Sequence, residues 1–214
     1  MRYPLPTFVL ALSAMGVPSF ARAQLTVDPV TTTGISGYRG SVTWLAAVSS
    51  LTAMNGVEWD EHSDKPCTMG LRVGTLTTPA YGDYVPGAHI EICGGNEHFI
   101  FPLTANSART VQLTRLGEYV RGIQVCTTNA NNHRLKGIRL YSATVAYHVS
   151  LGPVWPASVS VTNVAGSEES TQANCATWNS AVYCPANQIA SALVVHHTAE
   201  EIVGLALRCR GLTP

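Results

Sequence analysis

The sequence predicts an all-β domain built from three similar units, and three observations carry this prediction. Apolar residues alternate with polar or small ones along short segments, as in 119–126 and 135–145. Turns rich in Gly, Pro, Asn and Asp separate these segments, and no long stretch has helical spacing. A similar strand also recurs, because Gly70, Gly137 and Gly204 have matching apolar neighbours and stand 67 residues apart.

The first 23 residues predict a cleaved export signal. Arg2 precedes an apolar run, Leu5–Phe20. The run is followed by Ala21-Arg22-Ala23, which has the A-x-A pattern of a cleavage site before Gln24. A membrane anchor is the alternative, but the run is short for a span and is interrupted by prolines. We therefore expect residues 1–23 to be a signal peptide. Residues 24–214 would form one secreted domain, outside the cell or in a periplasm, with no membrane insertion after cleavage.

The charge of the chain argues against two classes of partner. The sequence has 13 basic and 13 acidic residues, and its only lysines are Lys65 and Lys136. Nucleic acids and anionic membranes are bound through basic patches. We therefore expect no nucleic acid partner.

Six cysteines form an even set, which in an exported chain predicts up to three disulfides. We expect Cys184 to pair with Cys209, because this bond would clamp the two ends of the apolar hairpin 188–209. A zinc site is the alternative, but no two cysteines have CxxC spacing. The pairing of the other four stays open; they are Cys67, Cys93, Cys126 and Cys175.

The first unit, residues 24–82, begins with an extended segment and ends with a hairpin. Residues 41–51 are the one place where a short helix competes with a strand. The hairpin strands are expected at Val57–Trp59 and Gly70–Leu76. Between them, Asp60–Pro66 is the most charged stretch of the chain and is expected to be a loop. It offers oxygen ligands for a hard cation, but it lacks the EF-hand pattern, and a solvated loop is the simpler interpretation.

The second and third units each contain a clear hairpin. In the second unit, residues 83–150, Gly122 and Gly137 lie inside the expected strands and indicate bulges or close approach of another backbone. In the third unit, residues 151–214, two apolar strands in 188–209 flank a short polar turn.

Three similar units around one axis would protect their sheet edges, because each unit covers the open side of the next. A β-prism and a β-trefoil both have this pseudo-threefold arrangement. Trefoil repeats are usually shorter than 67 residues, so we expect a disulfide-stabilised β-prism.

The end of the chain resembles the vitelline membrane outer layer protein family. In that family a tryptophan, a Cys-Pro pair, an apolar strand and a Gly-Ile-Arg-Leu strand ending in cysteine recur in each of three repeats. The matching residues are Trp178, Cys184-Pro185, Ile189–Val195 and Ile202–Cys209. The middle unit keeps Gly137–Leu140 but has Ser142 in place of the cysteine, and the family's G-x-W-G turn is absent. The resemblance implies a β-prism I fold, which jacalin-like lectins also have, and it leaves the activity open.

Aromatic rings beside amide groups point to sugar binding. Such sites stack the apolar face of a sugar on a ring and surround it with short polar groups. The candidate binding residues are Trp178, Asn179, Tyr183 and Asn131. Trp59 and Trp155 offer further rings, and packing in the core is the alternative interpretation for each ring.

No set of catalytic residues stands out. The chain has neither G-x-S-x-G nor HExxH. Glu58 with Asp60, or Glu168 with Glu169, could act as a carboxylate pair, but nothing in the sequence sets the separation that glycoside hydrolysis requires. His196-His197 and the acidic residues after them could hold a metal. On a strand, however, adjacent histidines point to opposite faces, so a polar hairpin tip is the simpler interpretation.

We therefore expect a secreted β-prism protein that binds glycans or a polysaccharide-rich extracellular matrix and needs no cofactor. One alternative is a structural, envelope or protein-interaction protein of the same fold with no small-molecule site. The other is a carbohydrate-active enzyme.

Overall fold

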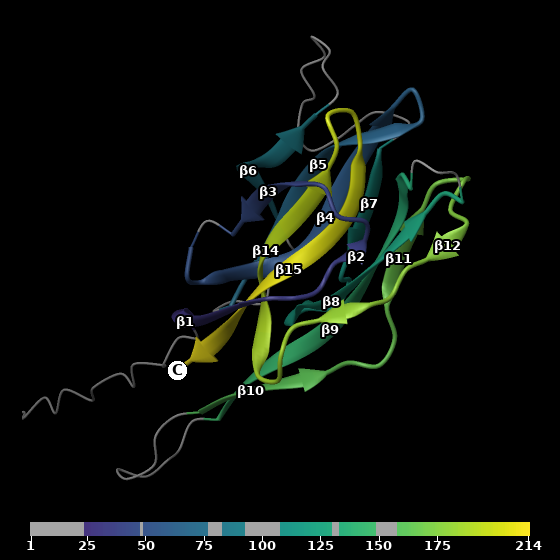
Figure 1. Ribbon diagram of the computed structural model, residues 1–214. Helices are drawn as coiled ribbons and strands as arrows, with labels where there is room; N and C mark the ends of the chain where they lie inside the picture. Colours follow the sequence, from purple (N-terminus) through teal and green to yellow (C-terminus); the bar gives the residue numbers. More distant parts are fainter. Residues whose placement is uncertain (1–23, 48, 77–82, 93–107, 130–132, 149–157) are drawn as a thin grey trace, which may run out of the picture.

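The computed structural model describes residues 24–47, 49–76, 83–92, 108–129, 133–148 and 158–214. Every regular element in these ranges is a β-strand, and the strands form three antiparallel sheets (Figure 1). The expected all-β class is therefore confirmed. None of the described residues form a helix that is long and apolar enough to cross a membrane. The expected signal peptide lies outside the described residues.

Sheet A joins the two ends of the chain. Its centre is the hairpin of β14 and β15, which lies between β1 and β3, while the short β2 also pairs with β15. The pairing brings Gln24 opposite Thr213. Residues 41–51, where a short helix competed with a strand, contain strand β3. The strands are β1 (Gln24–Thr32), β2 (Ser36–Gly37), β3 (Ser41–Ala46), β14 (Gln188–His197) and β15 (Ile202–Thr213).

Sheet B has the order β6-β5-β4-β7, with β4 and β5 as its central hairpin. Its strands are β4 (Thr52–His62), β5 (Lys65–Thr75), β6 (Asp83–Glu91) and β7 (Arg109–Gln112). The expectation of a charged loop over Asp60–Pro66 was wrong. Ser63 and Asp64 both have positive φ, 51° and 65°, and close a two-residue turn, so the strands continue through the charged residues on either side.

Sheet C is built on the hairpin of β8 and β9. Strands β10 and β11 pair with β9, and the two-residue strands β12 and β13 pair with β8. The bounds are β8 (Glu118–Thr127), β9 (Leu135–His148), β10 (Ser158–Asn163), β11 (Glu168–Thr171), β12 (Thr177–Trp178) and β13 (Val182–Tyr183). The expected strands at 119–126 and 135–145 therefore match β8 and the greater part of β9.

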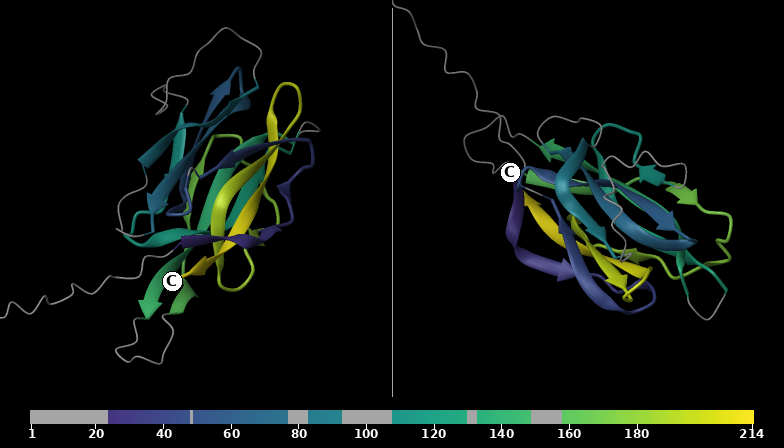
Figure 2. Two further views of the ribbon diagram at one scale, coloured as in Figure 1. Left: turned by 90° about the vertical axis from the view of Figure 1, so that its left-hand side faces the viewer. Right: turned by 90° about the horizontal axis from the view of Figure 1, so that it is seen from above.

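One core fills the space between the three central hairpins, which run alongside one another in Figures 1 and 2. Alternate residues of each hairpin point inward and are fully buried. Sheet B contributes Val57, Met69 and Leu71, sheet C contributes Ile123, Val125 and Ile138, and sheet A contributes Leu193, Val195 and Leu205.

The sheets do not follow the expected repeat boundaries of 24–82, 83–150 and 151–214. Strands β1 to β3 pair with the C-terminal hairpin, so the first part of the expected first unit belongs to the sheet of the third. The recurring glycines do occupy equivalent strands, with Gly70 in β5, Gly137 in β9 and Gly204 in β15. The division into three repeats stays a prediction.

Two disulfides are described in full. Cys184 bonds to Cys209, the pair expected from the sequence, with 5.6 Å between the Cα atoms. Cys126 bonds to Cys175 and ties β8 to the segment before β12. Cys67 also takes part in a disulfide, while Cys93 lies outside the described residues.

Candidate functional site

The outward face of sheet C carries a continuous row of aromatic and polar side chains, which we call the sheet C strip. It consists of Trp178, Arg139, Gln124, Tyr141, Tyr183 and Arg121. Strands β12 and β13 place its two ends, because Trp178 pairs with Cys126 and Tyr183 with Gly122 on β8. Four residues of an extended strand separate these positions, a distance of about 13 Å. The strip therefore extends over several polar and aromatic groups.

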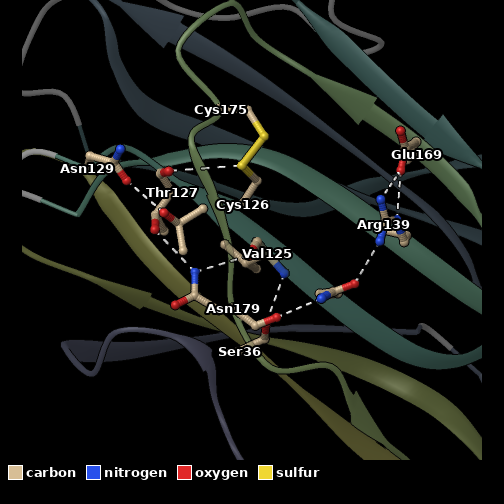
Figure 3. Close-up of a disulfide and its surroundings, with 11 residues drawn as sticks. Ser36, Val125, Cys126, Thr127, Asn129, Arg139, Glu169, Cys175 and Asn179 are labelled. Carbon is tan, nitrogen blue, oxygen red and sulfur yellow. Dashed lines mark hydrogen bonds and ion pairs between the residues drawn. A yellow bond between two sulfur atoms is a disulfide. The ribbon is translucent and has the colours of Figure 1, made fainter.

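Trp178 forms one end of the strip and rests on an arginine. The guanidinium carbon of Arg139 lies 4.1 Å from the centroid of the indole ring, which is cation–π geometry. Arg139 Nε donates to Glu169 Oε2 at 2.7 Å, as Figure 3 shows. Burial lowers the pKa of Arg139, but the bonds to Glu169 and Tyr141 outweigh this and raise the pKa overall. Trp178 is thus held on a fixed, charged support.

Gln124 connects the two ends of the strip. Its Oε1 accepts hydrogen bonds from Arg139 Nη1 at 3.1 Å and from the Tyr141 hydroxyl at 2.8 Å. Its Nε2 donates to the carbonyl oxygen of Asn179 at 2.7 Å. Both the oxygen and the nitrogen of its side-chain amide therefore bond to neighbouring parts of the strip.

Asn179 faces inward to the backbone of β8. Its Nδ2 donates to Val125 O at 3.1 Å and to Thr127 Oγ1 at 3.2 Å, and Figure 3 shows the side chain pointing toward both. These two bonds use both amide hydrogens. Asn179 therefore holds the segment between β12 and β13 in place.

Tyr183 forms the other end of the strip. Half of its surface is exposed, and its ring centroid lies 5.1 Å from that of Tyr141 at an angle of 52°. Burial and the nearby Tyr141 raise the pKa of Tyr183. A Cβ on Gly122 would lie only 2.4 Å from the Tyr183 ring, so the close approach of this ring requires glycine there. Of the two expectations for Gly122, the bulge is confirmed, whereas the group that approaches it closely is the Tyr183 side chain and not another backbone.

A groove of about 530 Å³ opens beside Tyr183. Arg121, Tyr141 and Tyr183 form its sheet side. Asn163, the last residue of β10, and Ser167, just before β11, also line it. The groove thus combines two aromatic rings with hydroxyl, amide and guanidinium groups.

A β-bulge turns Arg121 toward this groove. Val120 pairs with Ser142 and Gly122 pairs with Tyr141, so Arg121 is an extra residue in β8. Val120 and Ile123 are both fully buried in the core, and the two residues between them must therefore face outward. The sequence indicates a bulge or close approach at Gly122, but Arg121 is not among the site residues predicted from it. The sequence does contain a sign of the bulge. In a regular strand one residue separates two core residues, but two residues, Arg121 and Gly122, separate Val120 from Ile123.

The other residues singled out from the sequence lie elsewhere. Trp59 is fully buried in the core, which excludes it as a ligand platform. Asn131 and Trp155 lie outside the described residues. His196 and His197 both belong to β14; His196 contacts Gly40 O and His197 contacts Thr43 Oγ1. Burial lowers the pKa of His196.

The turns of the three central hairpins meet in a group of ion pairs that we call the turn cluster. Lys136, at the start of β9, is fully buried and donates from Nζ to Glu61 Oε1 at 2.9 Å and to Asp64 Oδ1 at 2.5 Å. Arg134 bridges Asp64 at 3.2 Å and Glu201 at 2.7 Å, in the turns of sheets B and A. Burial raises the pKa of Glu61 despite Lys136, whereas the hydrogen bond from Lys136 lowers the pKa of Asp64.

The carboxylates that the sequence offered as an alternative catalytic pair each have other contacts. Arg72 pairs with Glu58, which is fully buried on β4. Asp60 is also buried and accepts a hydrogen bond from the amide of Glu61. Glu168 accepts a bond from Thr114, and Glu169 is held by Arg139.

Comparison with known proteins supports the fold. No protein-family model matches the sequence, and no curated protein does. Among solved structures, the agglutinin of Calystegia sepium aligns with a TM-score of 0.50 and 11% identity, over 86% of this chain and 99% of that one. Calsepa lectin in complex with a biantennary N-glycan aligns with a TM-score of 0.49 and 12% identity, over 87% and 99%. A mannose-specific jacalin-related lectin from Morus nigra, in complex with mannose, gives 0.42 and 9%, over 87% and 99%. The alignment with the agglutinin, at a TM-score of 0.50, shows a β-prism fold for this chain. The resemblance to the vitelline membrane outer layer family stays a prediction.

Proposed function

We propose that this protein is a secreted, lectin-like β-prism protein that binds glycans at the groove and strip of sheet C. The observation that carries the proposal is the groove of about 530 Å³ beside the half-exposed ring of Tyr183. Its volume lies within the usual range for small-ligand sites. The fold, shared with an agglutinin, is in keeping with this function.

The Tyr183 ring would serve as the stacking platform. It is held from behind by the bare backbone of Gly122 and from the side by Tyr141, so little freedom would be lost when a sugar binds. Asn163 and Ser167, which also line the groove, would then bond sugar hydroxyls. Aromatic platforms with short polar neighbours suit sugars, because a pyranose has one apolar face and a rim of hydroxyls.

Trp178 would extend binding along the strip toward a second sugar residue. Its distance from Tyr183, about 13 Å along the strand, favours an oligosaccharide over a single sugar. Asn179 and Gln124 would position this end through their bonds to β8 and to each other. Asn131, which lies outside the described residues, remains a candidate ligand.

The proposal is tested by alanine substitution on a glycan array and on insoluble chitin, cellulose and peptidoglycan. Tyr183→Ala should abolish retention, and Trp178→Ala should weaken it for longer glycans. Sheet A supplies matched controls, since Trp44 is 53% exposed and also carries an arginine, Arg208, over its ring. Trp44→Ala should leave binding unchanged. Wild-type protein that is folded yet retained by no glycan would refute the proposal.

A role in protein interaction is the second candidate. Val42 and Trp44, on the edge strand β3 of sheet A, are 49% and 53% exposed and two residues apart, so they lie on the same face of that strand. If Trp44→Ala, rather than Tyr183→Ala, removed binding to a matrix that contains both protein and glycan, this candidate would replace the first.

A further inference from the structure

We infer that the groove of sheet C selects acidic sugars, with the guanidinium of Arg121 binding the sugar carboxylate. This inference rests on the proposed glycan-binding function and names the class of glycan. It follows from where the bulge directs Arg121, from its buried Nε, which has no hydrogen-bond partner among the described residues, and from the charges of its surroundings.

The bulge gives Arg121 a position that a regular strand would not. With one residue fewer between Val120 and Ile123, the outward face here would hold only Gly122, beneath the Tyr183 ring. The extra residue adds a charged side chain beside that ring, on the wall of the groove. Bulges of this kind commonly redirect a side chain next to a binding site.

Arg121 has unused hydrogen-bonding capacity in the described part of the chain. Its Nε is buried and has no hydrogen-bond partner there. Arg139 and Arg134, which are also partly buried, are engaged by Glu169 and Glu201, whereas Arg210 shares with Arg121 a buried Nε without a partner in the described residues. A buried donor of a charged group without a partner is costly, which makes a ligand acceptor at this point favourable.

The carboxylates near the groove are already occupied. Glu118 accepts a hydrogen bond from Ser142 at 3.0 Å and pairs with Arg115 at 3.7 Å. Glu168, next to Ser167, accepts a bond from Thr114. Arg121 is the one charged residue among those that line the groove in the described structure. The groove thus presents a net positive charge to a ligand.

A sugar carboxylate matches these features. The planar guanidinium offers parallel N–H donors that fit a carboxylate in two places at once. A uronic or nonulosonic acid could stack its ring on Tyr183 while its carboxylate reaches Arg121. A neutral sugar would leave the guanidinium partly desolvated without a counter-charge.

The test compares acidic sugars with their own methyl esters, which remove the charge and little else. Trimers of galacturonate and of glucuronate, and N-acetylneuraminate, are titrated calorimetrically into the oxidised mature protein, each beside its ester. At least one acid should bind about tenfold or more tightly than its ester. The difference should shrink as salt is raised, because the interaction is between charges.

Variants then assign the preference to Arg121. Arg121→Gln should remove the difference between acid and ester, and Arg121→Lys should keep part of it. Arg208→Gln, which removes an arginine over an aromatic ring on sheet A, is the matched control and should change neither affinity. Should Arg121→Gln fail to fold, the comparison of acid with ester on the wild-type protein still decides the ligand class.

The outcomes separate this inference from the proposed function. Retention of neutral glycans, with acids and esters bound equally, would overturn the inference and leave glycan binding standing. An acid preference that survives Arg121→Gln would overturn the assignment to Arg121. Binding of no glycan at all would overturn both.

Discussion

Lys136 offers the sharpest test of how the turns of this protein are held together. It is one of only two lysines in the chain, and its side chain is fully buried. Its ammonium group bonds to the side chains of Glu61 and Asp64 and to the backbone oxygen of Asp64. We propose the change Lys136→Met. Lys136 precedes the recurring glycine Gly137, and Met69 occupies the matching position before Gly70. Met69 is also fully buried, so the protein already has a methionine in this kind of position.

The magnitude follows from the exposure of the two partners. Removing one member of a fully buried ion pair costs about 3–5 kcal/mol. The Glu61 side chain is 11% exposed and would lose the cation that it is bonded to, whereas Asp64 is 51% exposed and can turn to water and to Arg134. We therefore expect the low end, about 3 kcal/mol. For a domain of this size that corresponds to a fall in Tm of about 9 °C.

The assay is urea and thermal unfolding of the oxidised protein, followed by circular dichroism. Lys65→Met is the control, because Lys65 is partly exposed and pairs with the exposed Glu200, and it should barely change stability. The double variant Lys136→Met/Glu61→Leu should recover much of the loss, since it removes the buried carboxylate as well. If Lys136→Met were no less stable than Lys65→Met, the buried ion pairs of the turn cluster would not stabilise the fold as we expect.

Three further predictions concern the disulfide, the ring platform and acid stability. The double variant Cys184→Ala/Cys209→Ala opens a loop with a sequence separation of 25 residues and should lower the free energy of unfolding by about 3.5 kcal/mol in urea titration; a loss below about 1 kcal/mol would contradict this. Gly122→Ala should push the Tyr183 ring aside and weaken glycan binding about tenfold or more in calorimetry, while stability changes by less than about 1 kcal/mol because the ring can swing into solvent. The pKa of Asp64 is held below its ordinary value of 3.8, so its contribution to stability is complete above pH 3.8 and is lost as pH falls through the lower, folded-state pKa. Asp64→Asn tolerates the same positive φ and should flatten this acid-dependent loss in unfolding titrations, whereas an unchanged pH profile would show that Asp64 does not carry it.

The strands could be predicted where they depend on local alternation. The segments 119–126 and 135–145 became β8 and most of β9, because residues that alternate in burial need no distant information. Cys184 and Cys209 could also be paired in advance, since both lie at the ends of one hairpin. By contrast, the pairing of β1 with β15 joins opposite ends of the chain, and no local pattern encodes it.

The site was predictable only in part, because contacts between residues far apart in the sequence leave no local pattern. Trp178 and Tyr183 were chosen as rings, and the structure places both on the outward face of sheet C. Arg139 and Gln124, which link them, looked like ordinary strand residues because their partners come from other strands. Arg121 was missed because its direction depends on a bulge, which sets a register that the sequence only hints at through Gly122.

The pairing of the two chain ends also has a consequence for how the protein is made. Strands β1 and β3 take their places beside β14 and β15, which come much later in the chain. At ordinary rates of translation, the first strands would wait roughly 10 to 35 s for their partners to emerge. Sheets B and C, whose strands are contiguous in the chain, can form during that interval, but sheet A cannot. Strands β1 and β3 therefore stay without these partners until β14 and β15 have been synthesised, and until then they remain extended segments that lack their final sheet.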